Sequence, residues 1–257
     1  MPHALNDLRI TVDDLGMFPE IEKSVSTLSA YGMPLYGSWL TNYGAPSKDV
    51  LSGKHGIHHG LHFNLLEGAA KITNPTITDQ NGQFNRRWAE FVVPMRRMRI
   101  AVEEQLAHQI SVALEWFGSL SHIDSHLHIH SIPWIYKLMR ATQKKHGIEH
   151  LRNPYEPVKD LGRPLPKLLL LEAFRIVNRP EALPCFGISS TFTMDAAKCV
   201  QILKNGPREL IWHTSLGMPN FNGTPQSMSL STNQWRLRCI EHYALEALLK
   251  ELSHDVN

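Results

Sequence analysis

Residues 122–130 read His-Ile-Asp-Ser-His-Leu-His-Ile-His, with an ionisable side chain at every even-numbered position. In an extended strand this alternation places the imidazoles and the carboxylate on one face and the apolar residues on the other. If the later part is helical, His122 and His126 still face the same way. Each ring left without a partner would cost roughly 1–3 kcal/mol. The stretch therefore predicts a metal site or a hydrogen-bonded cluster rather than a His-rich surface loop, with Asp124 orienting a ligand imidazole.

Ionisable residues also end other strands that the sequence predicts. The strand Leu8–Val12 runs into Asp13, on its polar face, and Asp14, in the following turn. Two adjacent carboxylates can divide their tasks, one holding a cation and the other accepting a proton, or can cap the next helix. On the strand Gly60–Leu65, His62 occupies the polar face and is either a ligand or a satisfied core histidine.

Two later strands end in the same way. The strand Ile148–Arg152 ends in an arginine, which can clamp a carboxylate or form an ordinary surface ion pair. The strand Glu209–His213 ends in a histidine, a residue that is alone more often structural than catalytic. Because five predicted strands deliver ionisable groups to their C-terminal ends, we expect these groups to converge on one face.

The pattern of the whole chain predicts an α/β fold. Short apolar runs alternate with amphipathic segments, which is typical of parallel βαβ units, and no Gly-x-Gly-x-x-Gly follows the first strand. We expect one domain over residues 1–257, a (β/α) barrel that is complete or incomplete. The remaining predicted elements are strands at Gly37–Leu40, Ser121–Asp124 and Cys185–Ser189, helices at Pro19–Tyr31, Arg96–Phe117, Pro133–His146 (capped by Ser131), Leu165–Val177, Met194–Lys204 and Trp235–Leu252, and loops over 66–94 and 217–232.

Composition narrows the class of protein and of partner. Apolar residues make up 42% of the 257 residues, which excludes a disordered chain. The formal charge of +2 gives no electrostatic reason to expect nucleic acid or an anionic membrane as a partner. The three cysteines lie too far apart for a disulfide framework and suit a reducing compartment. With no long apolar segment and no signal-like N-terminus, we expect a cytoplasmic protein.

Three of these stretches resemble, in order and spacing, the YdjC-like family of carbohydrate deacetylases. They are Val12–Gly16, Gly60–Leu65 and His122–His130, and the likeness continues through Gly147–Arg152 and Glu209–His213. The family includes chitooligosaccharide deacetylases, which remove an acetyl group from N-acetylglucosamine units. The resemblance implies a distorted (β/α) barrel related to NodB-type polysaccharide deacetylases, and a small acetylated sugar as the substrate.

The resemblance also implies a divalent metal site. Asp14, His62 and His126 match the family's ligands. Two imidazoles and one carboxylate leave open positions on the ion. We expect Mg²⁺, with Zn²⁺ as the alternative, since carboxylate and imidazole suit either ion.

The same resemblance suggests catalytic roles. Asp13 is the expected general base, Arg152 its supporting cation and His213 the general acid, with His128 and His130 as competitors for the last role. An acid must be protonated when the sugar amine leaves, so activity is expected to fall at alkaline pH.

The sequence departs from the family in two places. Leu15-Gly16-Met17-Phe18 stands where Phe-Gly-Leu-Ser is usual, which removes a helix-capping hydroxyl and predicts a bulky ring near the mouth of the site. Thr214 stands where proline is common. Trp88 or Trp212 could offer a stacking surface for a sugar ring.

Two other functions stay open on the sequence. A phosphoesterase or another amidohydrolase would use the same residue types, often with two metals. A non-catalytic metal-binding or sugar-binding relative would have no need for a spare base beside a metal ligand. A homo-oligomer also stays open.

Overall fold

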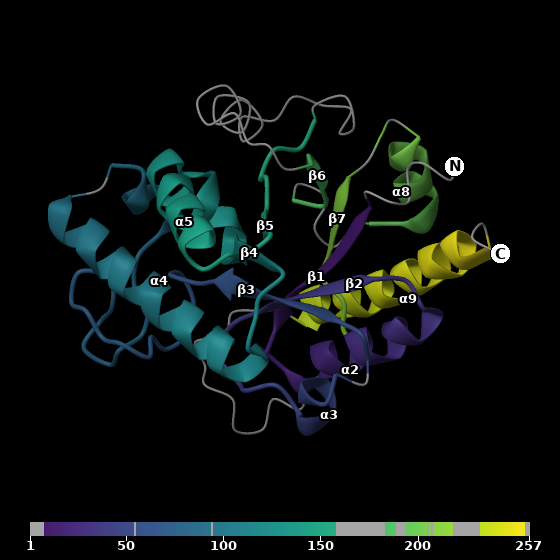
Figure 1. The fold of residues 1–257 in the computed structure, drawn as a ribbon, viewed down its shortest axis with the longest axis horizontal. Helices are drawn as coiled ribbons and strands as arrows, with labels where there is room; N and C mark the ends of the chain where they lie inside the picture. The colour runs from purple at the N-terminus through teal and green to yellow at the C-terminus, as the bar shows by residue number, and fades with distance from the viewer. Residues whose placement is uncertain are drawn as a thin grey trace.

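Seven parallel strands form one sheet in the described part of the chain (Figure 1). The structure is a computed structural model that describes residues 8–53, 55–93, 95–157, 183–188, 194–204, 206, 208–217 and 232–254. The order across the sheet is β5-β4-β3-β2-β1-β7-β6. The strands are β1 (Arg9–Leu15), β2 (Leu35–Trp39), β3 (His58–Phe63), β4 (His122–Ser125), β5 (His150–Leu151), β6 (Cys185–Phe186) and β7 (Glu209–Trp212).

The sheet curls until its two edges approach each other. Beyond β5 and before β6, Asn153 and Pro184 form an isolated parallel bridge, and the backbone N–H of Cys185 donates to the carbonyl of Tyr155 at 2.9 Å. The edges are therefore joined by single contacts and not by a full ladder. The predicted α/β fold with an incomplete barrel is confirmed.

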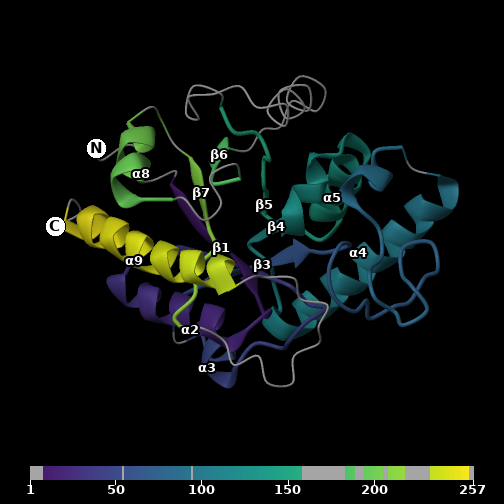
Figure 2. The ribbon, with the colours of Figure 1, turned by 180° about the vertical axis from the view of Figure 1, so that it is seen from behind.

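Helices cover the outside of the curled sheet (Figure 2). Helices α4 and α5 lie on one side, and α2, α8 and α9 lie on the other (Figures 1 and 2). The helices are α2 (Pro19–Leu28), α3 (Lys48–Leu51), α4 (Arg96–Phe117), α5 (Pro133–Lys145), α8 (Ala196–Leu203) and α9 (Thr232–His254), with 3-10 turns η1 (Ser29–Tyr31), η2 (Trp88–Phe91) and η3 (His126–Ser131). The helix predicted over Leu165–Val177 and most of the predicted loop 217–232 lie outside the described residues.

Several helix ends follow the sequence. Gly32 after η1 and Gly118 after α4 have positive φ values of 75° and 72°, which glycine adopts more readily than other residues. Phe18 precedes α2 without a side-chain cap, as the missing hydroxyl predicts, and Pro19 is the first helical residue. The prediction of Ser131 as the cap of α5 is wrong, because Ile132 occupies that position.

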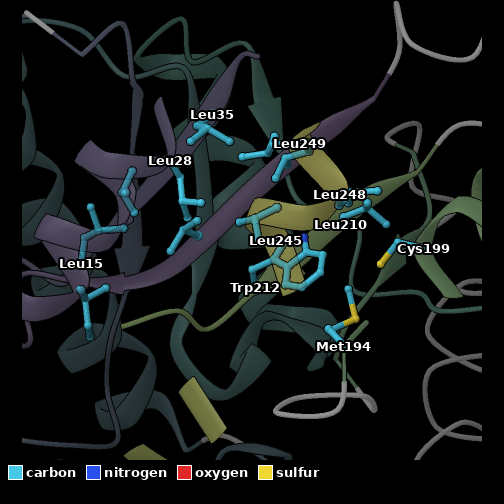
Figure 3. Packing of buried hydrophobic residues seen from close by; sticks show 14 of the residues in the cluster. Leu15, Leu28, Leu35, Met194, Cys199, Leu210, Trp212, Leu245, Leu248 and Leu249 are labelled. Carbon is cyan, nitrogen blue, oxygen red and sulfur yellow. The ribbon is translucent and has the colours of Figure 1, made fainter. Parts of the chain in front are cut away.

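Two apolar clusters pack the helices onto the sheet. One fills the space between the sheet and α2, α8 and α9, and the other lies under α4 and α5. Trp212 is completely buried in the first cluster beside leucines of α9, so the prediction that it stacks on a sugar is wrong (Figure 3). Phe18 is also buried, with its ring edge-on to Trp235 at 4.8 Å.

The described helices and cysteines bear on membrane insertion and on disulfide bonding. None of the helices that the structure describes has the length and apolarity needed to cross a bilayer. Cys185, Cys199 and Cys239 are free thiols. The cytoplasmic location stays a prediction.

Candidate active site

An irregularity in β1 brings two neighbouring carboxylates into the interior. The pairing of β1 with β2 shifts register between Val12 and Leu15, and Asp14 has φ of 67°. Aspartate tolerates this left-handed conformation better than most residues, and a bulge redirects side chains that would otherwise alternate. Asp13 and Asp14 are therefore both buried inside the curled sheet. Asp14 belongs to the strand and not to the turn that the sequence predicts.

Asp14 meets two imidazoles from neighbouring strand ends. Its Oδ1 lies 2.9 Å from His126 Nδ1 and 3.4 Å from His62 Nε2. Ligand atoms of the three residues all lie within 4.8 Å of one another, and all three side chains are buried. One carboxylate oxygen and two ring nitrogens at this separation can hold a divalent cation.

Further side chains hold this three-residue cluster in place. Asp124 Oδ1 lies 2.6 Å from His62 Nδ1, as predicted for a carboxylate that orients an imidazole. Ser38 donates to the same oxygen at 2.5 Å. On the other side, Arg238 of α9 donates to Asp14 Oδ2 at 2.5 Å, which leaves Oδ1 facing the imidazoles. Neither Ser38 nor Arg238 carries a sequence signal.

The electrostatics of the cluster favour a cation. Burial alone would lower the pKa of His62, but the carboxylates of Asp13 and Asp124 outweigh it and raise that pKa to about 10. The pKa of His126 is raised in the same way, against burial, by Asp14. Burial opposes ionisation of Asp14, yet Arg238 and His126 hold its pKa well below the usual range. The carboxylates thus draw positive charge onto the rings, so the residues present fit a metal ion.

Arg152 clamps the other carboxylate of the pair. Its Nη1 and Nη2 donate to Asp13 Oδ2 and Oδ1, both at 2.8 Å, and Nη2 also lies 2.6 Å from Asp124 Oδ2. All three residues are completely buried, so an ordinary surface ion pair is the wrong interpretation of Arg152. Burial raises the pKa of Asp13, with Arg152 opposing, which leaves Asp13 a stronger base than an exposed aspartate.

Glu209 fixes the arginine from behind. Its Oε1 accepts from Arg152 Nε at 2.8 Å and from Thr11 Oγ1 at 2.9 Å. Its Oε2 lies 3.1 Å from His150 Nε2. Burial opposes ionisation of Glu209, but Arg152 and His150 hold its pKa well below the usual range. The sequence marks Glu209 only as the start of a strand.

A second set of possible ligands already contacts a guanidinium. Asp13, His62 and Asp124 also place ligand atoms within 4.8 Å of one another. Arg152 Nη2 contacts both carboxylates of this set, at 2.8 and 2.6 Å. The guanidinium supplies part of the positive charge that a second ion would bring.

His213 follows β7 and is buried, with its backbone N–H donating to Glu241 Oε2 at 2.8 Å. Burial lowers the pKa of its imidazole to about 3, and the carboxylate of Asp14 only partly opposes this. This environment favours the neutral ring, so an acid role requires that the ring gain a proton before the amine leaves. The fall in activity at alkaline pH expected from His213 stays a prediction.

The predicted alternation over 122–130 holds only as far as Ser125. Leu127 and His128 then adopt left-handed φ of 49° and 53°, which turns the chain through η3. His130 is buried with Nδ1 at 2.5 Å from Ser125 Oγ, and burial lowers its pKa to about 3. Of the histidines in this stretch, His126 is the one that joins the cluster around Asp14.

The comparisons with known proteins agree with this geometry. The chain is 28% identical over 158 residues to a carbohydrate deacetylase of Mus musculus, covering 58% of this chain and 51% of that one. It is 27% identical over 145 residues to a chitooligosaccharide deacetylase of Serratia marcescens, covering 55% and 57%. The chain thus spans about half the length of the curated relatives it matches.

A solved structure and a family model extend the likeness over nearly the whole chain. The fold matches a candidate cellobiose-phosphate cleavage protein of Enterococcus faecalis V583 with a TM-score of 0.65, at 16% identity over 96% of this chain and 93% of that one. The family model described as "YdjC-like protein" matches residues 7–251. The chain therefore belongs to the YdjC-like protein family.

Proposed function

We propose that this protein is a metal-dependent hydrolase that removes the N-acetyl group from a sugar containing N-acetylglucosamine and releases acetate. The observation that carries the proposal is the buried Asp13–Arg152 pair beside the cluster of Asp14, His62 and His126. The names of the curated relatives support the acetylated sugar as the substrate class. We also propose one domain over residues 1–257, since one sheet joins strands from Arg9 to Trp212.

In the proposed site Asp14, His62 and His126 hold one divalent ion, Mg²⁺ or alternatively Zn²⁺. When bound, such an ion polarises the acetamide carbonyl and makes a bound water more acidic. Arg238 and Asp124 orient the ligands Asp14 and His62 from behind, through the contacts at 2.5 and 2.6 Å.

Asp13 is the proposed general base. Its carboxylate takes a proton from the water that attacks the carbonyl carbon, while Arg152 holds the carboxylate in a single orientation. The leaving nitrogen needs one proton, and His213 is the proposed donor. Because its ring is neutral at rest, it must first receive the proton taken from the water. One proton on the nitrogen gives acetic acid and the neutral amine, and transfer of the acid's proton to that amine then gives acetate and the protonated amine, so water and amide balance.

A two-metal phosphoesterase fits the site less well. Its second ion would compete with Arg152 for Asp13 and Asp124. A measured stoichiometry of one metal ion per chain would support the deacetylase, and two ions per chain would support the phosphoesterase. A non-catalytic relative would gain nothing from a desolvated carboxylate such as Asp13 beside the ligands.

The proposal is tested by acetate release from diacetylchitobiose. Protein stripped with a chelator should be inactive. Adding Mg²⁺ or Zn²⁺ should restore acetate release, and the activity should reach its maximum when one ion is bound per chain. Loss of turnover in Asp13→Asn would tie the activity to this site. Hydrolysis of p-nitrophenyl phosphate without acetate release would contradict the proposal.

A further inference from the structure

Each imidazole of the cluster lies between Asp14 and a second carboxylate. His62 faces Asp14 with Nε2, and its Nδ1 lies 2.6 Å from Asp124. His126 faces Asp14 with Nδ1, and its Nε2 lies 3.2 Å from Glu67 Oε2. Glu67 therefore lies within ion-pair distance of His126, although it comes from a loop and its side chain is 31% exposed. The Asp124–His62 contact already has hydrogen-bond geometry, whereas His126 Nε2 is buried without a hydrogen-bond partner, so a small shift of the Glu67 carboxylate would complete the second bond.

The turn that carries Glu67 is held by a side-chain amide. Asn64 Oδ1 accepts from the backbone N–H groups of Leu66 and Glu67, at 2.9 and 3.2 Å. The Nδ2 of Asn64 donates to the Glu67 carbonyl at 2.7 Å, and that of Asn42 donates to the same carbonyl at 3.1 Å. Both the donor and the acceptor of the Glu67 backbone are thus fixed.

Gln109 of α4 extends this support. Its side-chain oxygen accepts from the Asn64 N–H at 3.0 Å, and its Nε2 donates to the Asn64 carbonyl at 2.7 Å. Asn42, Asn64 and Gln109 are all buried. Burying three amides is costly unless each is well bonded. They form a base under the turn that holds the backbone of Glu67, and so the start of its side chain, beside His126.

We propose that Glu67 is a positioning residue that accepts a hydrogen bond from His126 Nε2–H. This bond fixes the ring tautomer and leaves the lone pair of Nδ1 directed, beside Asp14, at the cation. The inference rests on the metal site of the proposed function. A carboxylate in this role changes metal affinity without touching the metal, typically by about 10–100-fold.

Zinc binding to chelator-treated protein, measured by calorimetry, tests the role. Glu67→Ala should weaken zinc binding about 10–100-fold, whereas Glu67→Gln should retain most of the affinity because its amide oxygen still accepts. Glu104→Ala is the matched control: it removes an exposed carboxylate that bonds Asn74 of the same 66–94 segment. The control should bind zinc as the wild type does.

Nitrogen-15 NMR of the histidine rings gives a second readout that a merely structural role would not change. In the zinc-loaded wild type, His126 should carry its proton on Nε2 and none on Nδ1. In Glu67→Ala the Nε2–H signal should lose its hydrogen-bonded shift.

Four results would overturn the inference. Zinc affinity unchanged in Glu67→Ala would remove the role of Glu67 while leaving the metal site intact. An unprotonated Nε2 on His126 would show that Glu67 does not accept a hydrogen bond from it. A loss of zinc affinity in Glu67→Gln that equals the loss in Glu67→Ala and exceeds about 10³-fold would also exclude a positioning role, for which about 10–100-fold is expected. A wild type that binds no zinc or magnesium would overturn the proposed metal site and this inference with it.

Discussion

Replacing Arg152 with methionine tests the buried charge network most directly. The guanidinium contacts three carboxylates, those of Asp13, Asp124 and Glu209, at N–O distances of 2.6 to 2.8 Å. All four residues are completely buried. Methionine removes the charge while keeping much of the side-chain length, so the three carboxylates lose their shared partner.

The structure sets the size of the expected effect. At an effective dielectric constant near 20, a pair of unit charges 2.8 Å apart gains about 6 kcal/mol of Coulomb energy. Desolvation offsets much of this gain, and breaking a buried pair costs a net of about 3–5 kcal/mol because the remaining charge is uncompensated. With three carboxylates dependent on Arg152, we expect at least the lower value, a large part of a total stability of about 5–15 kcal/mol.

The assay is urea unfolding followed by tryptophan fluorescence, since Trp39, Trp212 and Trp235 are completely buried. Lys250→Met is the control, because Lys250 forms an ion pair with Glu246 at the protein surface. Removing this pair should change the free energy of unfolding by no more than the experimental error.

Arg152→Lys is a milder second variant, which keeps the charge and loses the planar fork. It should fall between the wild type and Arg152→Met. A loss below about 1 kcal/mol in Arg152→Met, the range of an exposed pair, would refute the argument.

Three further predictions concern the same interior. Asp14→Asn should abolish metal binding in calorimetry, whereas Asp13→Asn should keep the metal and lose about 10²–10⁴ in turnover; equal metal loss would mean that the two roles are wrongly divided. Because the pKa of Glu209 is held well below its unfolded value near 4.3, the stability it contributes is complete above that pH and is lost on acidification. As the pH is lowered from 5 to 2, the urea midpoint of unfolding should therefore fall less steeply in Glu209→Gln than in the wild type. Identical slopes would show that protonation of Glu209 is not linked to unfolding. His213→Ala should reduce kcat/KM far more for an acetylated sugar amine than for an aryl acetate; equal losses would transfer the acid role to His128.

The sequence determines which groups reach the catalytic end of the sheet. Period-two alternation assigns His62 and Asp124 to the polar faces of their strands, and this assignment is local. Parallel strands bring their C-terminal ends to one edge, so the motifs are enough to predict that ionisable groups converge there. The resemblance to the YdjC-like family then selects Asp14, His62 and His126 from among them. Two imidazoles and a carboxylate in that volume indicate a cation site before any coordinates are known.

Other features follow only from the tertiary structure. The left-handed backbone of Asp14 is set by the shifted pairing of β1 with β2, and no residue pattern marks it. Arg238 reaches Asp14 from 224 residues away along the chain, and Glu67 reaches His126 because buried amides fix its turn.

Trp212 illustrates the same limit. Alternation along β7 places Trp212 on the opposite face from the residues before and after it. Only the packing of α9 against that face shows that it belongs to the core. A periodic pattern encodes the orientation of a side chain on its own element. The partner that it meets depends on how distant elements pack, and local sequence does not carry that information.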